Sequence, residues 1–369
     1  MPYKVIINLP VQDRSEYLPF GTTVVRRRTS NLAAHEAIHM NKHRFTSNKK
    51  KIRAIDLFCG AGGSSWGARN AGVQIVAGFD KWSLAGQVFQ DNFPEATFYP
   101  GRLERINLQD VARKLGKIDL ILASPECTTH SLARGNRRRS WHSSHTAFQV
   151  VRFASELQPR WIVVENVLSM LQWPRYEEFL DGLRQLGYHL REQRLTASEF
   201  GVPQSRTRLF VLCDRKRMPD EIIPSPKVVK KFASGAVDLN GRYPFSALKS
   251  PQRAEATLER ARVAIENVGT DQPFLLVYYG SDGAGGWQQL DVPLRTVTTL
   301  DRFALVKPGE DGHVMRMLQV PELKKAMGFP ALFKIQHGVR REKIHLLGNA
   351  VCPPVMRAIV RSLTQEGTS

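Results

Sequence analysis

Short apolar segments alternate with helical stretches from residue 52 onward, and this alternation most strongly limits the fold. The segments IRAIDLF, GVQIVAGFD, KIDLILASP, PRWIVVENV and RLFVLC have the length and composition of buried strands. Stretches such as SLAGQVFQDNF and YEEFLDGLRQLG fall between them and have a helical pattern. Strands separated by helices form a mostly parallel sheet that helices cover on both faces. We therefore predict an α/β fold with a doubly wound, mostly parallel sheet.

This pattern ends near residue 215. Residues 214–273 are rich in Pro, Lys and Arg, as in KRMPDEIIPSPKVVKKFASG and GRYPFSALKSPQR. Proline-rich stretches of this kind interrupt helices and strands. We therefore predict a domain boundary near residue 215, followed by a smaller and less regular domain.

The chain is strongly basic. It has 53 Lys/Arg against 34 Asp/Glu, and residues 1–53 hold eleven of these cations against three acids. The formal charge of +19 favours a polyanionic partner and salt-sensitive association. No apolar run approaches the length of a membrane span, and the first residues lack the pattern of a signal peptide. We expect an intracellular protein without a membrane partner, whose residues 1–50 are a solvated basic extension or an extra nucleic-acid contact.

The four cysteines are far apart in the sequence. Cys59, Cys127, Cys213 and Cys352 form no Cys-x-x-Cys pair, which argues against a zinc site, and we predict no metal. Disulfides are rare in a reducing compartment. A cysteine here is by default a small buried apolar residue. Cys127, in ASPECTTHS, has the further alternative of a nucleophile.

The segment DLFCGAGGSSWG reads as a strand, a glycine turn and the start of a helix. Glycines allow a sharp turn and a close approach to a ligand, and a helix start offers free N–H groups. Asp80 ends the next predicted strand, where a carboxylate can accept hydrogen bonds from ribose hydroxyls. Phe58 and Trp82 either flank an adenine ring or pack in the core.

Two further strand ends carry polar residues. Glu165 follows an apolar strand in VVENV and is either a proton donor with a raised pKa or a cap of the next helix. In QSRTR, Gln204, Arg206 and Arg208 alternate along an extended segment and share one face. Paired arginines can hold carboxylates or phosphates, although a solvated edge strand would show the same pattern.

Taken in order, these motifs resemble those of the DNA cytosine-5 methyltransferase family, in a prokaryotic or phage-type member. The order is Phe-x-Gly-x-Gly, an acid, Pro–Glu–Cys, Glu–Asn–Val, Gln-x-Arg-x-Arg and finally Gly–Asn–Ala–Val at residues 348–351. The segment PLRTVTTLDRF is similar to the family's Arg-x-x-Thr motif through Arg295 and Thr298. The resemblance covers roughly residues 52–215 and 290–357.

The resemblance implies a class I, Rossmann-like methyltransferase fold and the cofactor S-adenosyl-L-methionine. It implies that Cys127 is the nucleophile and that Glu165 pairs with the exocyclic amine and N3 of cytosine. Arg206 and Arg208 would orient the base and Glu165. The cofactor-binding residues it implies are Phe58, Gly60, Gly62, Asp80, Trp82, Asn349 and Val351.

The resemblance further implies methylation of C5 of a cytosine flipped out of double-stranded DNA. The expected DNA contacts are Arg134, Arg137, Arg138, Gln204 and Arg295. We expect a basic extension at 1–50, a catalytic domain at 51–215, a target-recognition domain at 216–330 and a C-terminal segment at 331–369 that packs back on the catalytic domain.

We expect the protein to lie in the cytoplasm of a bacterial or phage-infected cell, near the nucleoid. We also expect it to be a monomer. A cognate restriction endonuclease is a candidate partner. Two alternatives keep parts of this interpretation: the same chemistry on tRNA, or a DNA-binding relative without catalysis.

The sequence departs from the family pattern beside the predicted nucleophile. The usual Pro–Cys pair is here Pro125–Glu126–Cys127. A carboxylate next to a thiol raises the pKa of that thiol unless it points away or pairs with a cation. The acid expected to contact the adenine amine is also absent, and Arg102 and Glu104 stand in that region.

Overall fold

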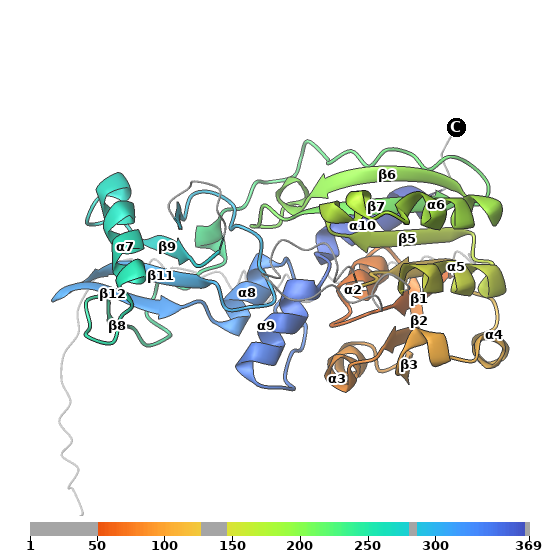
Figure 1. The fold of residues 1–369 in the computed structure, drawn as a ribbon, viewed down its shortest axis with the longest axis horizontal. Coiled ribbons are helices and arrows are strands. Elements are labelled where there is room, and N and C mark those ends of the chain that lie inside the picture. Colours follow the sequence, from red (N-terminus) through yellow and green to blue (C-terminus); the bar gives the residue numbers. More distant parts are fainter. Residues whose placement is uncertain (1–50, 127–145, 280–285, 366–369) are drawn as a thin grey trace, which may run out of the picture. The chain divides into compact units, whose positions relative to one another are not determined.

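The computed structural model describes residues 51–126, 146–279 and 286–365. Its main feature is a seven-stranded sheet with helices on both faces (Figure 1). The strands lie in the order β3 (Thr97–Pro100), β2 (Gln74–Asp80), β1 (Arg53–Leu57), β4 (Leu120–Ala123), β5 (Trp161–Asn166), β7 (Thr207–Asp214) and β6 (His189–Thr196). All neighbours pair in parallel except β7, which is antiparallel to β5 and β6. This confirms the predicted doubly wound, mostly parallel sheet.

The central strands are apolar throughout because both faces of the sheet are buried. In β4, Leu120 and Leu122 belong to one core cluster, and Ile121 and Ala123 belong to another. The first cluster includes residues of α2 (Gly63–Asn70), α3 (Ser83–Asn92) and α10 (Pro353–Thr364). The second includes residues of α4 (Leu108–Leu115), α5 (Thr146–Leu157) and α6 (Tyr176–Gln185). Among the helices the structure describes, none is long and apolar enough to cross a membrane.

Helix α10 packs very closely against α2. A Cβ atom on Gly67 would lie 2.5 Å from the Pro353 carbonyl oxygen and 2.7 Å from the Met356 Cβ. A Cβ on Gly63 would lie 2.3 Å from the Val351 carbonyl oxygen. The glycines after β1 therefore do more than shape a turn, because they also allow the C-terminal part of the chain to approach α2.

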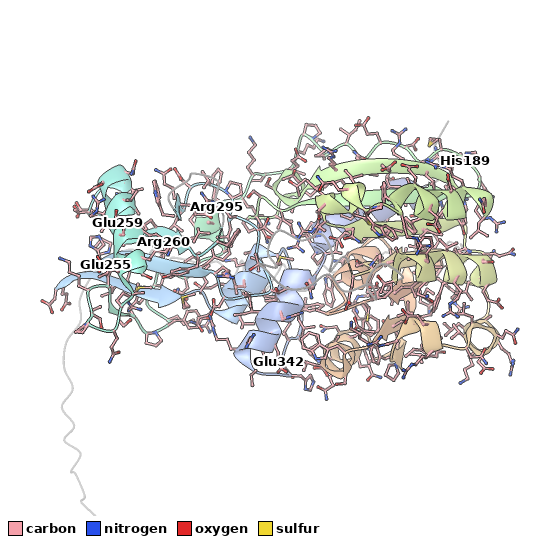
Figure 2. The ribbon with its side chains drawn as sticks, viewed as in Figure 1. His189, Glu255, Glu259, Arg260, Arg295 and Glu342 are labelled. Atoms are coloured by element: carbon pink, nitrogen blue, oxygen red, sulfur yellow. The ribbon has the colours of Figure 1, made fainter. Side chains whose placement is uncertain are left out.

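A second, smaller sheet is antiparallel. Its strands lie in the order β10 (Trp287–Gln289), β9 (Phe274–Val277), β11 (Phe303–Gly309), β12 (Gly312–Met317) and β8 (Ser246–Ala247). Phe274, Leu276 and Val306 belong to its own apolar cluster, and α7 (Glu255–Val268) contributes Ala261 and Ala264 to that cluster. Glu255, Glu259 and Arg260 are among the charged residues on α7 (Figure 2).

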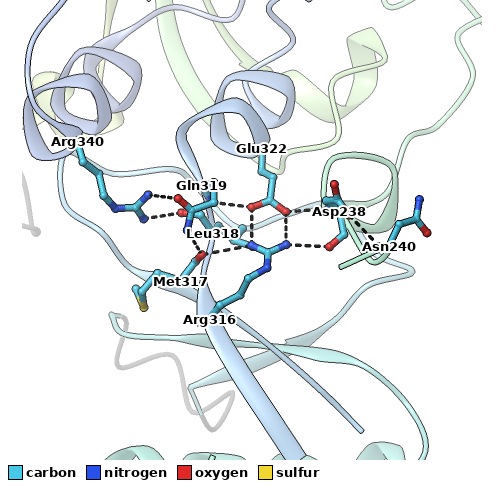
Figure 3. A network of polar contacts seen from close by, with 8 residues as sticks. All are labelled: Asp238, Asn240, Arg316, Met317, Leu318, Gln319, Glu322 and Arg340. Atoms are coloured by element: carbon cyan, nitrogen blue, oxygen red, sulfur yellow. Dashed lines mark hydrogen bonds and ion pairs between the residues drawn. The ribbon is translucent and has the colours of Figure 1, made fainter. Parts of the chain in front are cut away.

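A buried ion pair joins the smaller sheet to the helices that follow it (Figure 3). Arg316 on β12 donates to both carboxylate oxygens of Glu322 on α8 (Val320–Ala326), at 2.7 Å each. Glu322 also accepts from the Asp238 N–H, and Arg316 donates to the Asp238 carbonyl. At the start of α9 (Arg340–Asn349), Arg340 donates to the Leu318 carbonyl oxygen. Since these charges are paired and hydrogen-bonded, their burial is tolerated.

Candidate active site

The predicted site residues lie where parallel strands end at a common edge of the large sheet. Leu57 at the end of β1 is in register with Ala123 at the end of β4, and Ala123 is in register with Val164 of β5. The chain that follows each strand therefore emerges at the same edge. Ligands of open α/β sheets bind at this carboxyl edge. The switch point between β1 and β4, which are neighbours in the sheet, also lies here.

The loop after β1 has an unusual backbone. Phe58 has a φ of 58°, a left-handed conformation that is rare for a residue with a side chain. Gly60 and Gly62 also have positive φ, at 50° and 84°. The Cys59 N–H donates to the Phe79 carbonyl at 3.0 Å, which ties the loop to β2. Strained backbone of this kind collects at functional sites, where the surrounding structure holds it in place.

Asp80 holds this loop from the end of β2. Its carboxylate accepts the Gly60 N–H at 2.9 Å and the Trp82 N–H at 2.8 Å. Burial raises the pKa of Asp80, and the two N–H donors oppose that rise. A carboxylate has about four lone-pair sites, so two remain for other donors. The arrangement suits a ligand that presents hydroxyl groups beside a glycine loop.

The end of α9 lies beside the same loop. Val351 is buried and its carbonyl oxygen occupies the space that a Gly63 side chain would need. Asn349, at the end of α9, is exposed. The Trp82 ring meets the His345 ring edge-on, with 5.3 Å between their centroids. The predicted cofactor residues from three distant parts of the chain therefore meet around one loop.

Beneath the loop lies a buried carboxyl group that the sequence analysis did not identify. Asp56 accepts the Ser65 hydroxyl at 2.6 Å and the Ser65 N–H at 3.2 Å. Its burial raises the pKa of Asp56 to about 7, against the effect of both Ser65 hydrogen bonds. The pair links β1 to α2 across the glycine turn.

Glu165 and Arg208 form a buried pair at the end of β5. Arg208 Nε lies 3.3 Å from Glu165 Oε1, and both side chains are largely buried. Arg208 reaches this edge because β7 runs antiparallel to β5 and begins where β5 ends. Burial raises the pKa of Glu165, while Arg208 and then Arg206 oppose that rise. Burial and the neighbouring Arg206 lower the pKa of Arg208, yet a guanidinium stays protonated at neutral pH. The pair is thus a carboxyl group that can carry a proton next to a permanent cation.

Arg206 and Gln204 connect this pair to later parts of the chain. Arg206 donates to the Val297 carbonyl at 3.0 Å and to the Gly348 carbonyl at 2.9 Å. Gln204 is fully buried, accepts the Val297 N–H and donates to the Ala326 carbonyl. These contacts give Gln204 a structural role, and its burial does not support the predicted contact with DNA.

Of the other residues predicted to contact DNA, the structure describes Arg295. Arg295 is half-buried (Figure 2). Its backbone N–H donates to Gln288 Oε1 at 3.0 Å, and the preceding residue, Leu294, forms an isolated β-bridge with Gln204. The predicted nucleophile Cys127 lies outside the described residues. So do Arg134, Arg137 and Arg138.

Two further residues act on the chain just before Cys127. Lys81 Nζ lies 2.7 Å from Glu126 Oε1, so the acid that replaces the family's proline has a cationic partner. Asn166, next to Glu165, donates from its side chain to the Pro125 carbonyl at 3.0 Å. The sequence placed Lys81 directly after Asp80 at a strand end, and that position was the only signal for its role.

Similar proteins were found by sequence and by structure. M.HindV, a Type II methyltransferase of Haemophilus influenzae, is 28% identical over 52% of this chain and 65% of its own length. M.BsuFI, a Type II methyltransferase of Bacillus subtilis, is 24% identical over 86% of this chain and 73% of its own length. This chain thus spans slightly less than two thirds of M.HindV.

A DNMT2 variant from Spodoptera frugiperda has a similar fold. Its TM-score is 0.62 at 18% identity, over 85% of this chain and all of that one. The model of the family described as C-5 cytosine-specific DNA methylase matches residues 52–365, which include both sheets and the whole carboxyl edge with its motifs. This protein therefore belongs to the C-5 cytosine-specific DNA methylase family.

Proposed function

We propose that the protein transfers a methyl group from S-adenosyl-L-methionine to C5 of cytosine in DNA. The observation that carries this proposal is the buried Glu165–Arg208 pair, which lies at the same strand edge as the glycine loop and the Pro125 segment. A carboxyl group with a raised pKa beside a fixed cation suits a polar heterocycle that gains negative charge during reaction. The Type II methyltransferase relatives support a role in DNA modification.

The glycine loop fits the cofactor. A Cβ on Gly60 would meet no atom of the described chain within 4 Å, so the loop has open space at this point. We assign its binding to Phe58, Gly60, Gly62, Asp80, Trp82, Asn349 and Val351, with Asp80 on the ribose hydroxyls. When bound, the cofactor supplies an electrophilic methyl group on a sulfonium ion.

The chain's own groups then activate the cytosine. C5 of cytosine is a poor nucleophile, and addition of the Cys127 thiolate to C6 converts the ring into an enamine. As the Sγ–C6 bond forms, electrons move onto N3, where Glu165 donates a proton or hydrogen bond. Arg208 keeps the Glu165 carboxyl in place. After C5 has taken the methyl group, the C5 proton passes to water, the C5–C6 double bond re-forms, and the Sγ–C6 bond breaks to release the Cys127 thiolate.

A cytosine stacked in a duplex cannot be attacked at C6, so we propose that it is flipped out. We assign recognition of the duplex to residues 216–330, which include the smaller sheet, with Arg295 and the basic residues Arg134, Arg137 and Arg138 as candidate contacts. We assign residues 331–369 to a C-terminal segment of the catalytic part, which is supported by the packing of α10 on α2. A cognate restriction endonuclease fits the relatives' designation as Type II enzymes.

The test offers tritium-labelled cofactor with duplex DNA or with tRNA. We expect label in DNA. Label only in tRNA would contradict the proposed substrate while leaving the chemistry intact.

Glu165→Gln preserves the size of the side chain but cannot donate the acid proton. We expect kcat to fall by about 10²-fold or more with cofactor binding unchanged. Glu178→Gln is the matched control, because Glu178 is an exposed acid in an ion pair with Arg175 on the same domain.

A further inference from the structure

A cavity lies apart from the candidate active site. It has a volume of about 490 Å³, within the range of small-molecule sites. Trp66 and Asn70 of α2, Pro353 and Arg357 of α10, and loop residues around 201–203, 231–235 and 325–330 form its wall. Of the predicted site residues that the structure describes, none lines this cavity. The proposed methyl transfer therefore leaves it without a role.

The charges of its wall all have one sign. Lys231, Lys325 and Arg357 line the cavity and are exposed, and among its described lining residues there is no Asp or Glu. Like charges around one concavity repel one another, and a bound anion relieves that repulsion. An arginine fork with two ammonium groups suits a phosphate, which accepts several charge-assisted hydrogen bonds.

Much of the rest of the wall is apolar, with Asn70 and Ser234 as its polar members. Phe329 and Trp66 are buried in it, Pro330, Pro353 and Pro354 lie beside them, and Phe232 at 41% exposure adds an aromatic ring. Aromatic and proline surfaces favour a planar apolar partner, by stacking or edge contact. A ligand with only a phosphate would leave the exposed Phe232 ring in water.

We propose that this cavity binds a nucleoside monophosphate, with its base against the aromatic and proline wall and its phosphate on Lys325, Arg357 and Lys231. The same chemistry is present in a free nucleotide and in the phosphorylated 5′ end of a DNA strand. The proposal does not rest on methyl transfer, because binding alone tests it.

The test is isothermal titration of the full chain with thymidine 5′-monophosphate, thymidine and inorganic phosphate. Saturating S-adenosylhomocysteine occupies the proposed cofactor site throughout, so that site does not contribute. We expect thymidine 5′-monophosphate to bind, and each of the two fragments to bind at least about tenfold more weakly, since each lacks one half of the contacts. A 5′-phosphorylated trithymidylate identifies the source: tighter binding points to a strand end, and equal binding to a free nucleotide.

Lys325→Gln and Arg357→Gln should each weaken binding at least about tenfold, because each removes a charge-assisted contact. Arg361→Gln, one turn further along α10 and outside the cavity wall, should leave binding unchanged. Thermal unfolding of each variant checks that the fold is intact. The proposal is overturned if thymidine 5′-monophosphate does not bind, if phosphate alone binds as tightly, or if both cavity variants bind like the parent protein.

Discussion

At the scale of single residues, the pair of Lys81 and Glu126 explains how an acid can precede the proposed nucleophile. The two side chains are about half exposed, so their 2.7 Å contact contributes little to stability. Its effect is local, because the ammonium group offsets the field of the Glu126 carboxylate. The exchange of proline for glutamate thus comes with a compensating cation directly after the end of β2.

This pairing predicts a shift in the pH dependence of methyl transfer. Lys81→Gln should leave Glu126 uncompensated, raise the pKa of the Cys127 thiol and move the rising limb of the single-turnover rate to higher pH. The double variant Lys81→Gln/Glu126→Gln should return the limb towards its original position. Lys117→Gln is the control, because it removes an exposed lysine that pairs with the half-buried Asp119 at 3.6 Å. Identical profiles for all variants would show that Lys81 has no such role.

Asp56 predicts a pH effect on stability rather than on rate. Its pKa rises from 3.8 to about 7 in the folded protein, so the folded state prefers the protonated form. The stability that this preference contributes is complete below pH 3.8 and is lost as the pH rises through about 7. Asp56→Asn should remove this loss, so the difference in Tm between variant and parent should grow from pH 4 to pH 7. A constant difference over that range would contradict the raised pKa.

At the scale of elements, the contact between α2 and α10 depends on the absence of side chains. Gly67→Ala would place a methyl group against the Pro353 carbonyl oxygen and Met356. We expect a loss of about 1–3 kcal/mol in the free energy of unfolding, as in other overpacked cores. Gly235→Ala is the control, because its Cβ would meet no described atom within 4 Å. Denaturant unfolding of both variants measures their free energies of unfolding. Equal values would mean that α2 and α10 accommodate the added methyl group without loss of stability.

The sequence predicted the elements whose signals are local. The apolar runs identified β1, β2, β4, β5 and β7, and the polar residues at their ends located the site edge. The smaller sheet was harder to predict, because β8 and β10 have only two and three residues and their pairing is set by distant partners. The position of the Pro-rich stretch after β7 also depends on a distant partner. The Gln193 side chain on β6 exchanges two hydrogen bonds with the Ile222 backbone, and no local sequence pattern predicts this contact.

The same limit explains what the sequence missed within the site. Alternation placed Gln204, Arg206 and Arg208 on one face, and only Arg208 forms an ion pair with Glu165. Arg206 and Gln204 bind backbone groups about 90 residues away or more, so their burial depends on tertiary packing. Residue type alone could not separate an arginine that binds backbone carbonyls from one that pairs with Glu165.

At the scale of the whole molecule, positive charge is the dominant property. The chain carries +19 in all, and residues 1–48 contribute seven Lys/Arg and three Asp/Glu. Contacts with phosphates release counterions from DNA, and this makes affinity depend on salt.

Deletion of residues 1–48 should weaken duplex binding and reduce its salt dependence. Each lost phosphate contact should reduce the slope of log K against log salt by about 0.9. Fluorescence anisotropy on one duplex at several salt concentrations measures both quantities. Unchanged affinity and slope would make this segment a passive extension.

The proposed reaction itself is tested most directly by trapping its covalent intermediate. In a duplex whose cytosines are replaced by 5-fluorocytosine, the C5 fluorine cannot leave as the proton does, so the Sγ–C6 bond should persist after methyl transfer. We predict a cofactor-dependent, denaturation-resistant complex whose proteolysis yields the Cys127 peptide joined to the methylated base. Cys127→Ser should abolish the complex. Methyl transfer without an adduct, or an adduct on the buried Cys59, Cys213 or Cys352, would contradict the proposed mechanism.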